Sequence, residues 1–300
     1  MAEPLPPSAR LRADAALLGI TAVWGGTFVL VKDALDRAAP FVFLALRFAL
    51  AGAVVAALAR GQLRDRASVR RGLVLGLFLF LGFALQTFGL EDTTPSRSAF
   101  ITGLSVALVP FVAVFLFRRW PRLPSLLGIT LAVIGLYWLT LSGSAQAGGA
   151  RLRGDLLTLG CAVAYAFHIA VNERFAPVSK LFAMVAVQLW VVSLLSAICI
   201  PFFGGKLVLD GLLVWGVVFT GLFASALAIL VQTWGQARTT AVRAGLIFSL
   251  EPVFAAVYSM ALGREQLGAK EAVGGGLIVL GVAVAEVGNA LLDRWAPARG

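Results

Sequence analysis

The sequence predicts an all-α polytopic membrane protein: ten transmembrane helices, arranged as two inverted five-helix repeats around a central cavity. Composition is the first reason, since 60% of the residues are apolar, 13% are charged and the mean hydropathy is +0.92. Soluble domains do not reach such values. The other two reasons are a series of apolar runs of membrane-spanning length and an internal repeat of about half the chain.

The apolar runs define the expected helices. A helix needs about 20 mainly apolar residues to cross a bilayer, and ten such runs are separated by short segments that carry most of the charge. The first run is retained as a helix because no small-residue cleavage site of a signal peptide closes it. The expected spans are residues 15–31, 41–58, 72–90, 98–117, 125–141, 156–171, 181–203, 212–235, 244–262 and 272–291.

The repeat is clearest where Leu85-Gln86-Thr87-Phe88-Gly89 returns as Val231-Gln232-Thr233-Trp234-Gly235, 146 positions later. Matches of Gln, Thr, Arg and Gly in one register argue against coincidence between two apolar sequences. Five helices per half is an odd number, so the second half must enter the membrane in the opposite orientation. Other pairs in register are Arg97 with Arg243, Gly128 with Gly274 and, at an offset of 141, Asp14 with Asp155 and Trp24 with Tyr165.

The same pattern divides the chain. We expect a tail at 1–14, a first repeat at 15–142, a linker at 143–154, a second repeat at 155–291 and a second tail at 292–300. Both tails are expected in the cytoplasm, because the cytoplasmic segments then carry the larger share of Lys and Arg. This excess of Lys and Arg comes mainly from the first half of the chain. The orientation of the second half is therefore set by the number of helices that precede it and not by its own charges.

The net charge of +10 is spread over loops on both sides of the membrane. This distribution favours the anionic headgroups of the lipid bilayer as a partner and gives no indication of nucleic-acid binding. Cys161 and Cys199 are isolated within apolar runs, which is typical of packing residues and not of metal ligands. No cofactor is predicted, and without a Walker-type loop ATP is not expected to drive the protein directly.

Three motifs carry a resemblance to a known family. They are Val23-Trp24-Gly25-Gly26-Thr27-Phe28, Leu46-Arg47-Phe48 and Ser249-Leu250-Glu251-Pro252-Val253-Phe254. With the duplicated ten-span layout, they resemble the drug/metabolite transporter superfamily, EamA type. The resemblance implies a multi-pass protein of the inner (plasma) membrane that exports small metabolites such as amino acids. It also implies that the fifth and tenth helices are peripheral and that the first, third, fourth, sixth, eighth and ninth line the cavity.

Two glutamines and four aromatic residues are candidates for that lining. Gln86 and Gln232 lie toward opposite membrane faces, as inversion requires of a duplicated pair. They form either a polar ring around the pathway or hydrogen bonds between helices. Trp24 and Tyr165 lie at mid-span, where Trp is unusual. Together with Phe88 and Trp234, they either line a cavity for an apolar or aromatic solute or serve only as packing residues between helices.

Three of the ionisable residues within the spans are candidates for a functional role. Glu251 is nearly midway along the ninth, where an acid costs about 2.5–3.5 kcal/mol, and Pro252 weakens the adjacent turn. Glu251 is therefore expected to bind the ammonium group of a solute or to exchange a proton, with a structural hydrogen bond as the alternative. His168 is expected to be hydrogen-bonded and neutral, with titration near neutrality as the alternative. Arg47 is expected to form a structural ion pair or to extend to the outer headgroups, with contact to the substrate as the less favoured alternative.

The predicted function is secondary transport, with no enzymatic activity. We expect export of small metabolites, above all amino acids including aromatic ones or related apolar compounds, by alternating access, with the proton as a candidate coupling ion. A sugar-phosphate or nucleotide-sugar antiporter is the alternative, disfavoured because no span has Lys or Arg near the midplane. A lipid-modifying enzyme is less favoured, because one histidine and no His/Asp cluster offer little for catalysis.

Overall fold

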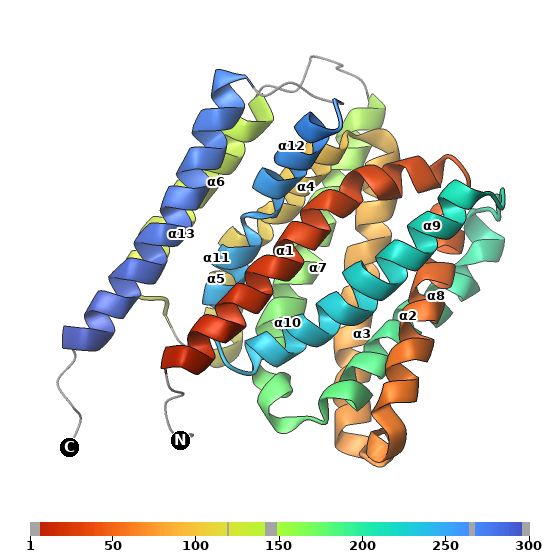
Figure 1. Ribbon diagram of the computed structural model, residues 1–300, viewed down its shortest axis with the longest axis horizontal. Coiled ribbons are helices and arrows are strands. Elements are labelled where there is room, and N and C mark those ends of the chain that lie inside the picture. Colours follow the sequence, from red (N-terminus) through yellow and green to blue (C-terminus); the bar gives the residue numbers. More distant parts are fainter. Residues whose placement is uncertain (1–6, 119, 142–148, 264–267, 296–300) are drawn as a thin grey trace.

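Each of the ten apolar runs forms a helix, or a series of consecutive helical segments, in the computed structural model, which describes residues 7–118, 120–141, 149–263 and 268–295 (Figure 1). Those residues contain no β-strand beyond an isolated bridge between Ala38 and Leu207. Nine of the described helices are long and apolar enough to cross a membrane, and Leu123–Trp138 is a shorter apolar helix. The predicted fold class is confirmed.

The first half contains α1 (Pro7–Leu35), α2 (Pro40–Ala59), α3 (Arg66–Asp92), α4 (Pro95–Gly103) followed by α5 (Ser105–Phe117), and α6 (Leu123–Leu141). The second half contains α7 (Gly149–Phe175), α8 (Leu181–Phe203), α9 (Gly211–Phe219), the π-helical segment η3 (Thr220–Leu227), α10 (Ala228–Gln236), α11 (Ala241–Phe248), α12 (Glu251–Ala261) and α13 (Ala269–Trp295). Short 3₁₀ turns, η1 (Arg60–Arg64) and η2 (Ala176–Val178), follow α2 and α7.

Among the helices that begin earlier than the apolar runs predict, two do so by seven or more residues. α1 begins at Pro7 and not at residue 15, and α7 begins at Gly149, inside the segment expected to be a linker. Both extra turns carry arginines, which are compatible with a helix continuing past the apolar core into the headgroup layer.

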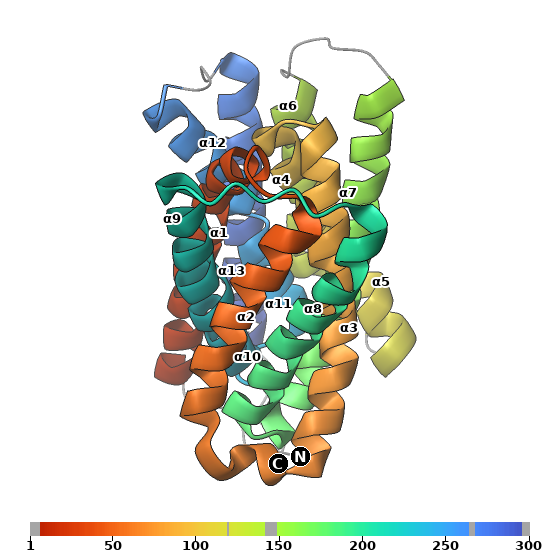
Figure 2. The ribbon, with the colours of Figure 1, turned by 90° about the vertical axis from the view of Figure 1, so that its right-hand side faces the viewer.

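The two halves are inverted. In Figure 1, α1 runs away from the end of the bundle at which α13 finishes, whereas its counterpart α7 runs toward that end. Two pairs of counterparts pack directly on one another, α2 on α8 and α6 on α13, and Figure 2 shows α2 and α8 side by side. The pair of α6 and α13 lies at the side of the bundle, as the resemblance implied for the fifth and tenth helices.

Glycines allow the closest of these contacts. A methyl group added at Gly128 would lie 2.4 Å from the carbonyl oxygen of Gly281, and one at Gly135 would lie 2.5 Å from that of Gly274. The glycines that the sequence places seven residues apart therefore face each other across α6 and α13. Gly72 is in similar contact with α8, where a methyl group would lie 2.7 Å from the Met184 carbonyl oxygen. Small residues of this kind allow helices to approach closely within a membrane bundle.

The fourth and ninth spans are interrupted at the same register. α4 gives way to α5 at Leu104, and α11 gives way to α12 at Ser249 and Leu250. Leu104 donates to the Ile101 carbonyl and Leu250 to the Ile247 carbonyl, each at 3.1 Å, so both interruptions are tight three-residue turns. The two halves therefore break at the same position of the repeat. Their prolines do not coincide, since Pro110 of the fourth span corresponds to Ala256 of the ninth.

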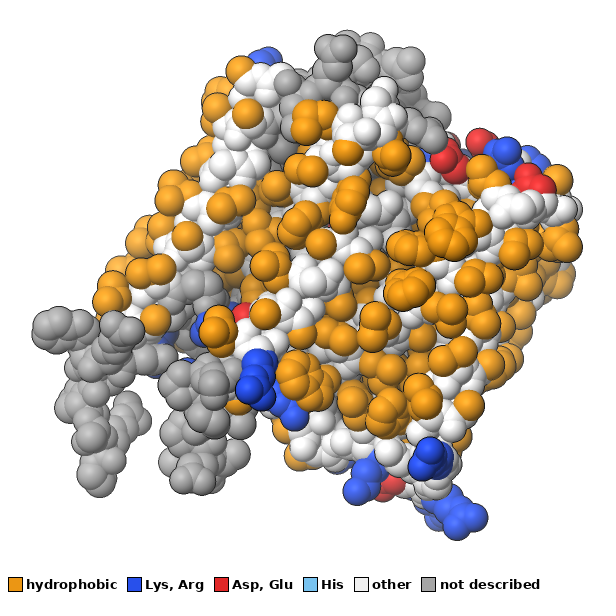
Figure 3. Space-filling view, viewed as in Figure 1, with side chains coloured by type: hydrophobic (Ala, Val, Ile, Leu, Met, Phe, Trp, Pro, Cys, Tyr) orange, Lys and Arg blue, Asp and Glu red, His pale blue; other side chains and the backbone are white. Residues whose placement is uncertain are grey.

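The outer surface suits lipid. Large apolar side chains project from the helices; among the most exposed are Phe111, Phe115 and Phe202. Figure 3 shows apolar side chains across the face of the molecule, with charged side chains gathered toward its two ends. This distribution is the one expected of a bundle whose middle lies in hydrocarbon.

Candidate functional site

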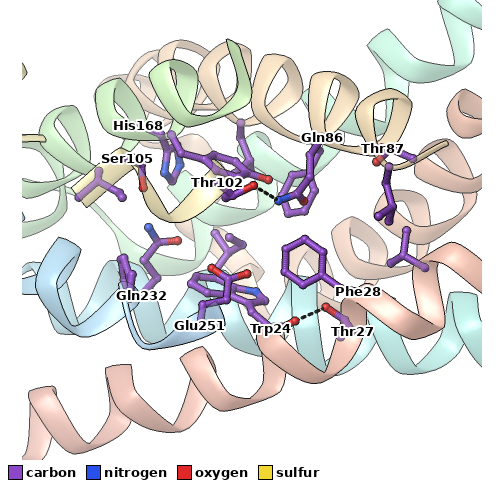
Figure 4. Close-up of a pocket in the computed structure, with 18 of the residues that line it drawn as sticks. Trp24, Thr27, Phe28, Gln86, Thr87, Thr102, Ser105, His168, Gln232 and Glu251 are labelled. Carbon is purple, nitrogen blue, oxygen red and sulfur yellow. Dashed lines mark hydrogen bonds between the residues drawn. The ribbon is translucent and has the colours of Figure 1, made fainter. Parts of the chain in front are cut away.

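A cavity lies between the two halves, and seven spans contribute to its lining. These are the six that the resemblance implied and the second, through Arg47. Among the residues predicted for the site, Trp24, Gln86, Tyr165, His168, Gln232 and Glu251 all line the cavity. Phe88 and Trp234 do not: the Phe88 ring centroid lies 4.9 Å from that of Phe41, and the Trp234 ring lies 4.4 Å from the guanidinium carbon of Arg238. Figure 4 shows Gln86, Thr102 and His168 on one side of the space and Trp24, Gln232 and Glu251 on the other.

Glu251 owes its position to the interruption of the ninth span. It is the first residue of α12, and the turn before it ends at Leu250. Gly25 of α1 packs so closely here that a methyl group on it would lie 2.8 Å from the Glu251 carbonyl oxygen. Within the described part of the chain, its carboxylate has no hydrogen bond or ion pair. The structural hydrogen bond that the sequence left open is therefore not found among those residues.

Trp24 and Tyr165, the repeat counterparts, form aromatic walls. The Trp24 indole donates from Nε1 to the Ala224 carbonyl oxygen at 2.9 Å, and its ring meets Phe248 edge-on with centroids 5.4 Å apart. The Tyr165 ring packs edge-on against Phe83 with centroids 5.6 Å apart. Both rings are fixed by neighbours while one surface faces the cavity, so the walls are rigid and largely apolar.

The two glutamines differ in their bonding. Gln86 of α3 donates from Nε2 to Thr102 Oγ1 of α4 at 3.1 Å, as the dashed line in Figure 4 shows. Gln232 of α10 has no hydrogen bond to another described residue, although its side chain is only 3% exposed. Gln86 thus combines a place in the lining with a bond between helices, and Gln232 keeps its amide for a solute or water.

His168 is hydrogen-bonded, as expected. Its Nε2 lies 2.8 Å from Gln188 Oε1 of α8, and the ring is 1% exposed. Asn172 lies one turn further along α7 and donates to Gln236 Oε1 at 2.8 Å. These buried bonds fasten α7 to α8 and to α10, so His168 has a structural partner besides its place in the lining.

Arg47 does not extend to the headgroups. Only 3% of it is exposed, and its guanidinium lies 5.2 Å from the Phe48 ring centroid and 4.9 Å from that of Phe83. Its Nε donates to Ser225 Oγ at 2.8 Å. The aromatic rings and the eighth span surround the side chain and leave it in the cavity lining. The cavity therefore contains a basic residue, which weakens the argument against a phosphorylated solute that rested on the lack of Lys or Arg near the midplane.

Four small hydroxyl residues in the lining were missed. They carry a weak sequence signal because Ser and Thr can satisfy themselves within a helix, as Thr27 does by donating to the Trp24 carbonyl at 2.7 Å. Thr102 and Ser105 flank the turn at Leu104. Recognising in the sequence that the helix breaks at the same position in both repeats would have indicated these two residues. The four are Thr27, Thr87, Thr102 and Ser105.

Comparison with known proteins agrees with this architecture. The EamA-like transporter family matches residues 11–141 and 152–286. An Archaeoglobus fulgidus protein named as an uncharacterized transporter is 32% identical over 275 residues, which cover 92% of this chain and 86% of that protein. A probable amino-acid metabolite efflux pump of Escherichia coli is 31% identical over 206 residues, covering 67% of this chain and 66% of the pump.

A crystal structure shows the same fold at 24% identity. The TM-score is 0.78, and the match covers 96% of this chain and 100% of the other. Both halves of the chain and the cavity between them thus fall within one known architecture.

Proposed function

The chain belongs to the EamA-like transporter family of the drug/metabolite transporter superfamily, and from this premise we propose that it exports amino acids and related apolar or aromatic metabolites. One observation carries the choice of solute. The carboxylate of Glu251 faces a cavity with aromatic walls and has no hydrogen bond or ion pair with any described residue. A buried acid without a partner is costly, and the ammonium group of a solute would supply the missing charge.

The proposed mechanism is alternating access. The repeats at 15–142 and 155–291 would move against one another, and residues 143–154 would link them. The interruptions at Leu104 and Leu250 are the points at which the fourth and ninth spans can bend, because helices break there already. Inverted repeats give two related shapes, one open to each side of the membrane.

Direction and orientation are part of the proposal. The similarity to a protein named as an efflux pump supports export. The larger share of Lys and Arg in the expected cytoplasmic segments supports cytoplasmic termini in the inner (plasma) membrane. Glu251 is also the residue placed to exchange a proton with the solute pathway, so a proton gradient is the proposed coupling, with no direct use of ATP.

The test is transport by the purified full-length chain in proteoliposomes, with and without a pH gradient. Glu251→Gln keeps the shape and the hydrogen-bonding capacity of the side chain while removing its charge. A charge-assisted hydrogen bond contributes about 1.5–3 kcal/mol, so we expect uptake of amine-bearing solutes to fall about tenfold or more. Glu91→Gln, an exposed acid near the end of α3, is the matched control and should keep the parental rate.

The role of Glu251 must be abandoned if Glu251→Gln folds and transports amine-bearing solutes at the parental rate with unchanged pH dependence. The wider proposal fails if the parental protein moves no amino acid but moves a sugar phosphate.

A further inference from the structure

Arg47 is a second charge in the cavity lining, and no acidic side chain of the described residues forms an ion pair with it. It lies in α2 and is 3% exposed. Within the described residues, no carboxylate lies within salt-bridge distance of its guanidinium. A charge at this depth costs several kcal/mol unless it is paired. The fold therefore keeps an unneutralised cation beside the solute space.

The surroundings of Arg47 hold it in place. Ser225 Oγ accepts from Nε at 2.8 Å, and the Ala224 carbonyl oxygen accepts a long bond from Nη2 at 3.5 Å. Both partners belong to the π-helical segment η3, and Trp24 donates to the same Ala224 carbonyl. Such π-helical turns place irregular backbone at functional sites. All these partners are neutral, so they orient the guanidinium without cancelling its charge.

Arg47 keeps unused hydrogen-bonding capacity. A guanidinium has five N–H donors in a planar fork that matches a carboxylate, and the bonds described above use Nε and one donor on Nη2. Nη1 has no hydrogen bond within the described chain. Because the residue is part of the lining, a solute anion can reach the remaining donors.

We propose that Arg47 binds the carboxylate of the solute while Glu251 binds its ammonium group, so that the cavity selects zwitterionic amino acids. This rests on the proposed function and specifies its substrate class. Both charged residues line the same cavity, and Tyr165 lines it as well. Their charges sum to zero, and so do those of a zwitterion. An amine or an organic acid alone would instead leave one buried charge of the pair unmatched.

The experiment uses three solutes that share one ring: phenylalanine, phenethylamine without the carboxylate, and 3-phenylpropionate without the amine. Counterflow is measured in proteoliposomes for the parental protein, Arg47→Gln and Arg47→Lys. We expect the parental protein to prefer phenylalanine. In Arg47→Gln the uptake ratio of phenethylamine to phenylalanine should rise about tenfold or more, because the carboxylate loses its partner and the amine loses a repelling charge. Arg60→Gln, at the exposed end of α2, should leave the ratio unchanged.

A merely structural role for Arg47 predicts a different result. If Arg47→Gln lowers uptake of all three solutes equally, or leaves the ratio unchanged, the inference is overturned. If Arg47→Gln does not fold, Arg47→Lys and Ser225→Ala provide the test. Each should raise the uptake ratio of phenethylamine to phenylalanine about threefold, because Lys lacks the planar guanidinium and the loss of Ser225 Oγ leaves that guanidinium less firmly held. An unchanged ratio in both variants overturns the inference.

The proposed function fails separately. A parental protein that transports none of the three solutes contradicts it before any variant is compared. Uptake of glucose 6-phosphate faster than phenylalanine would show that Arg47 serves a phosphate, and would overturn both.

Discussion

Arg97 and Asp155 form a two-point ion pair, with Nε 2.7 Å from Oδ1 and Nη2 2.6 Å from Oδ2. The pair joins the first turn of α4 to α7. The second half repeats it, since Arg243 Nη2 lies 2.8 Å from Asp14 Oδ2 and joins α11 to α1. Both arginines and both aspartates are counterparts in the repeat. Because the halves are inverted, the two pairs lie at opposite ends of the bundle.

We expect each ion pair to help close its own end of the cavity. The side chains are partly exposed, 26% and 19% in the first pair and 28% and 16% in the second, so each pair contributes about 1 kcal/mol at most. Arg97→Gln should therefore raise access to the cavity about fivefold from the end where α4 begins. Arg243→Gln should do so from the end where α1 begins.

Access can be measured as the labelling rate of one cysteine by an impermeant maleimide in vesicles of each orientation. The cysteine is Ser105→Cys in the lining, after Cys161 and Cys199 are replaced by alanine. Arg37→Gln breaks another ion pair, Arg37 with Asp210 at 3.2 Å, and serves as control. Equal labelling from both sides in all variants would contradict the assignment.

Gly25 should be essential for the position of Glu251. A methyl group there would lie 2.6 Å from Phe254 Cβ and 2.9 Å from the Ala255 nitrogen, so Gly25→Ala must move α12 away from α1. Strain of this kind costs about 1–3 kcal/mol, and we expect uptake of amine-bearing solutes to fall about tenfold in a protein that still folds. Gly19→Ala on the same helix meets nothing within 4 Å and should transport normally. Equal activity of the two variants would refute this.

Gly82 gives the Tyr165 ring its space. A methyl group on Gly82 would lie 2.2 Å from Tyr165 Cε1, so Gly82→Ala should displace the ring and weaken uptake of aromatic amino acids severalfold. If the effect acts through the ring, the double variant with Tyr165→Ala should be no worse than Tyr165→Ala alone. Additive losses in this double-mutant cycle would mean that Gly82 acts by another route.

The contact between α6 and α13 should determine stability and not substrate choice. Gly128→Ala places a methyl group against the Gly281 backbone, and overpacking of about 1–3 kcal/mol should lower Tm by about 5 °C. Relative rates for different solutes should stay at the parental values. Gly276→Ala, on α13 with open space around it, should keep or slightly raise Tm. A similar loss of Tm in both variants would point to a general intolerance of alanine.

The sequence by itself determined the series of apolar spans and the inversion of the halves. In a bilayer, an apolar run of membrane-spanning length must form a helix, and a repeat with an odd number of helices must be inverted in the second half. It also singled out Glu251, since an acid halfway along a span is too costly to be incidental. Six of the eight residues named for the site lie in the lining; the sequence singled them out because they are polar or bulky where apolar packing is the norm.

Only the tertiary structure decided which way those side chains face. The spans are apolar on every side, so helical periodicity does not mark an inner face as it does in a soluble bundle. Trp234 lies against Arg238, and Arg47, expected at the headgroups, lies among Phe48, Phe83 and Ser225. Ser225 is far from Arg47 in the chain, and a contact of that kind depends on how whole helices pack. Among the described residues, an acid and a base that form no ion pair line one cavity, and that arrangement is a property of the fold.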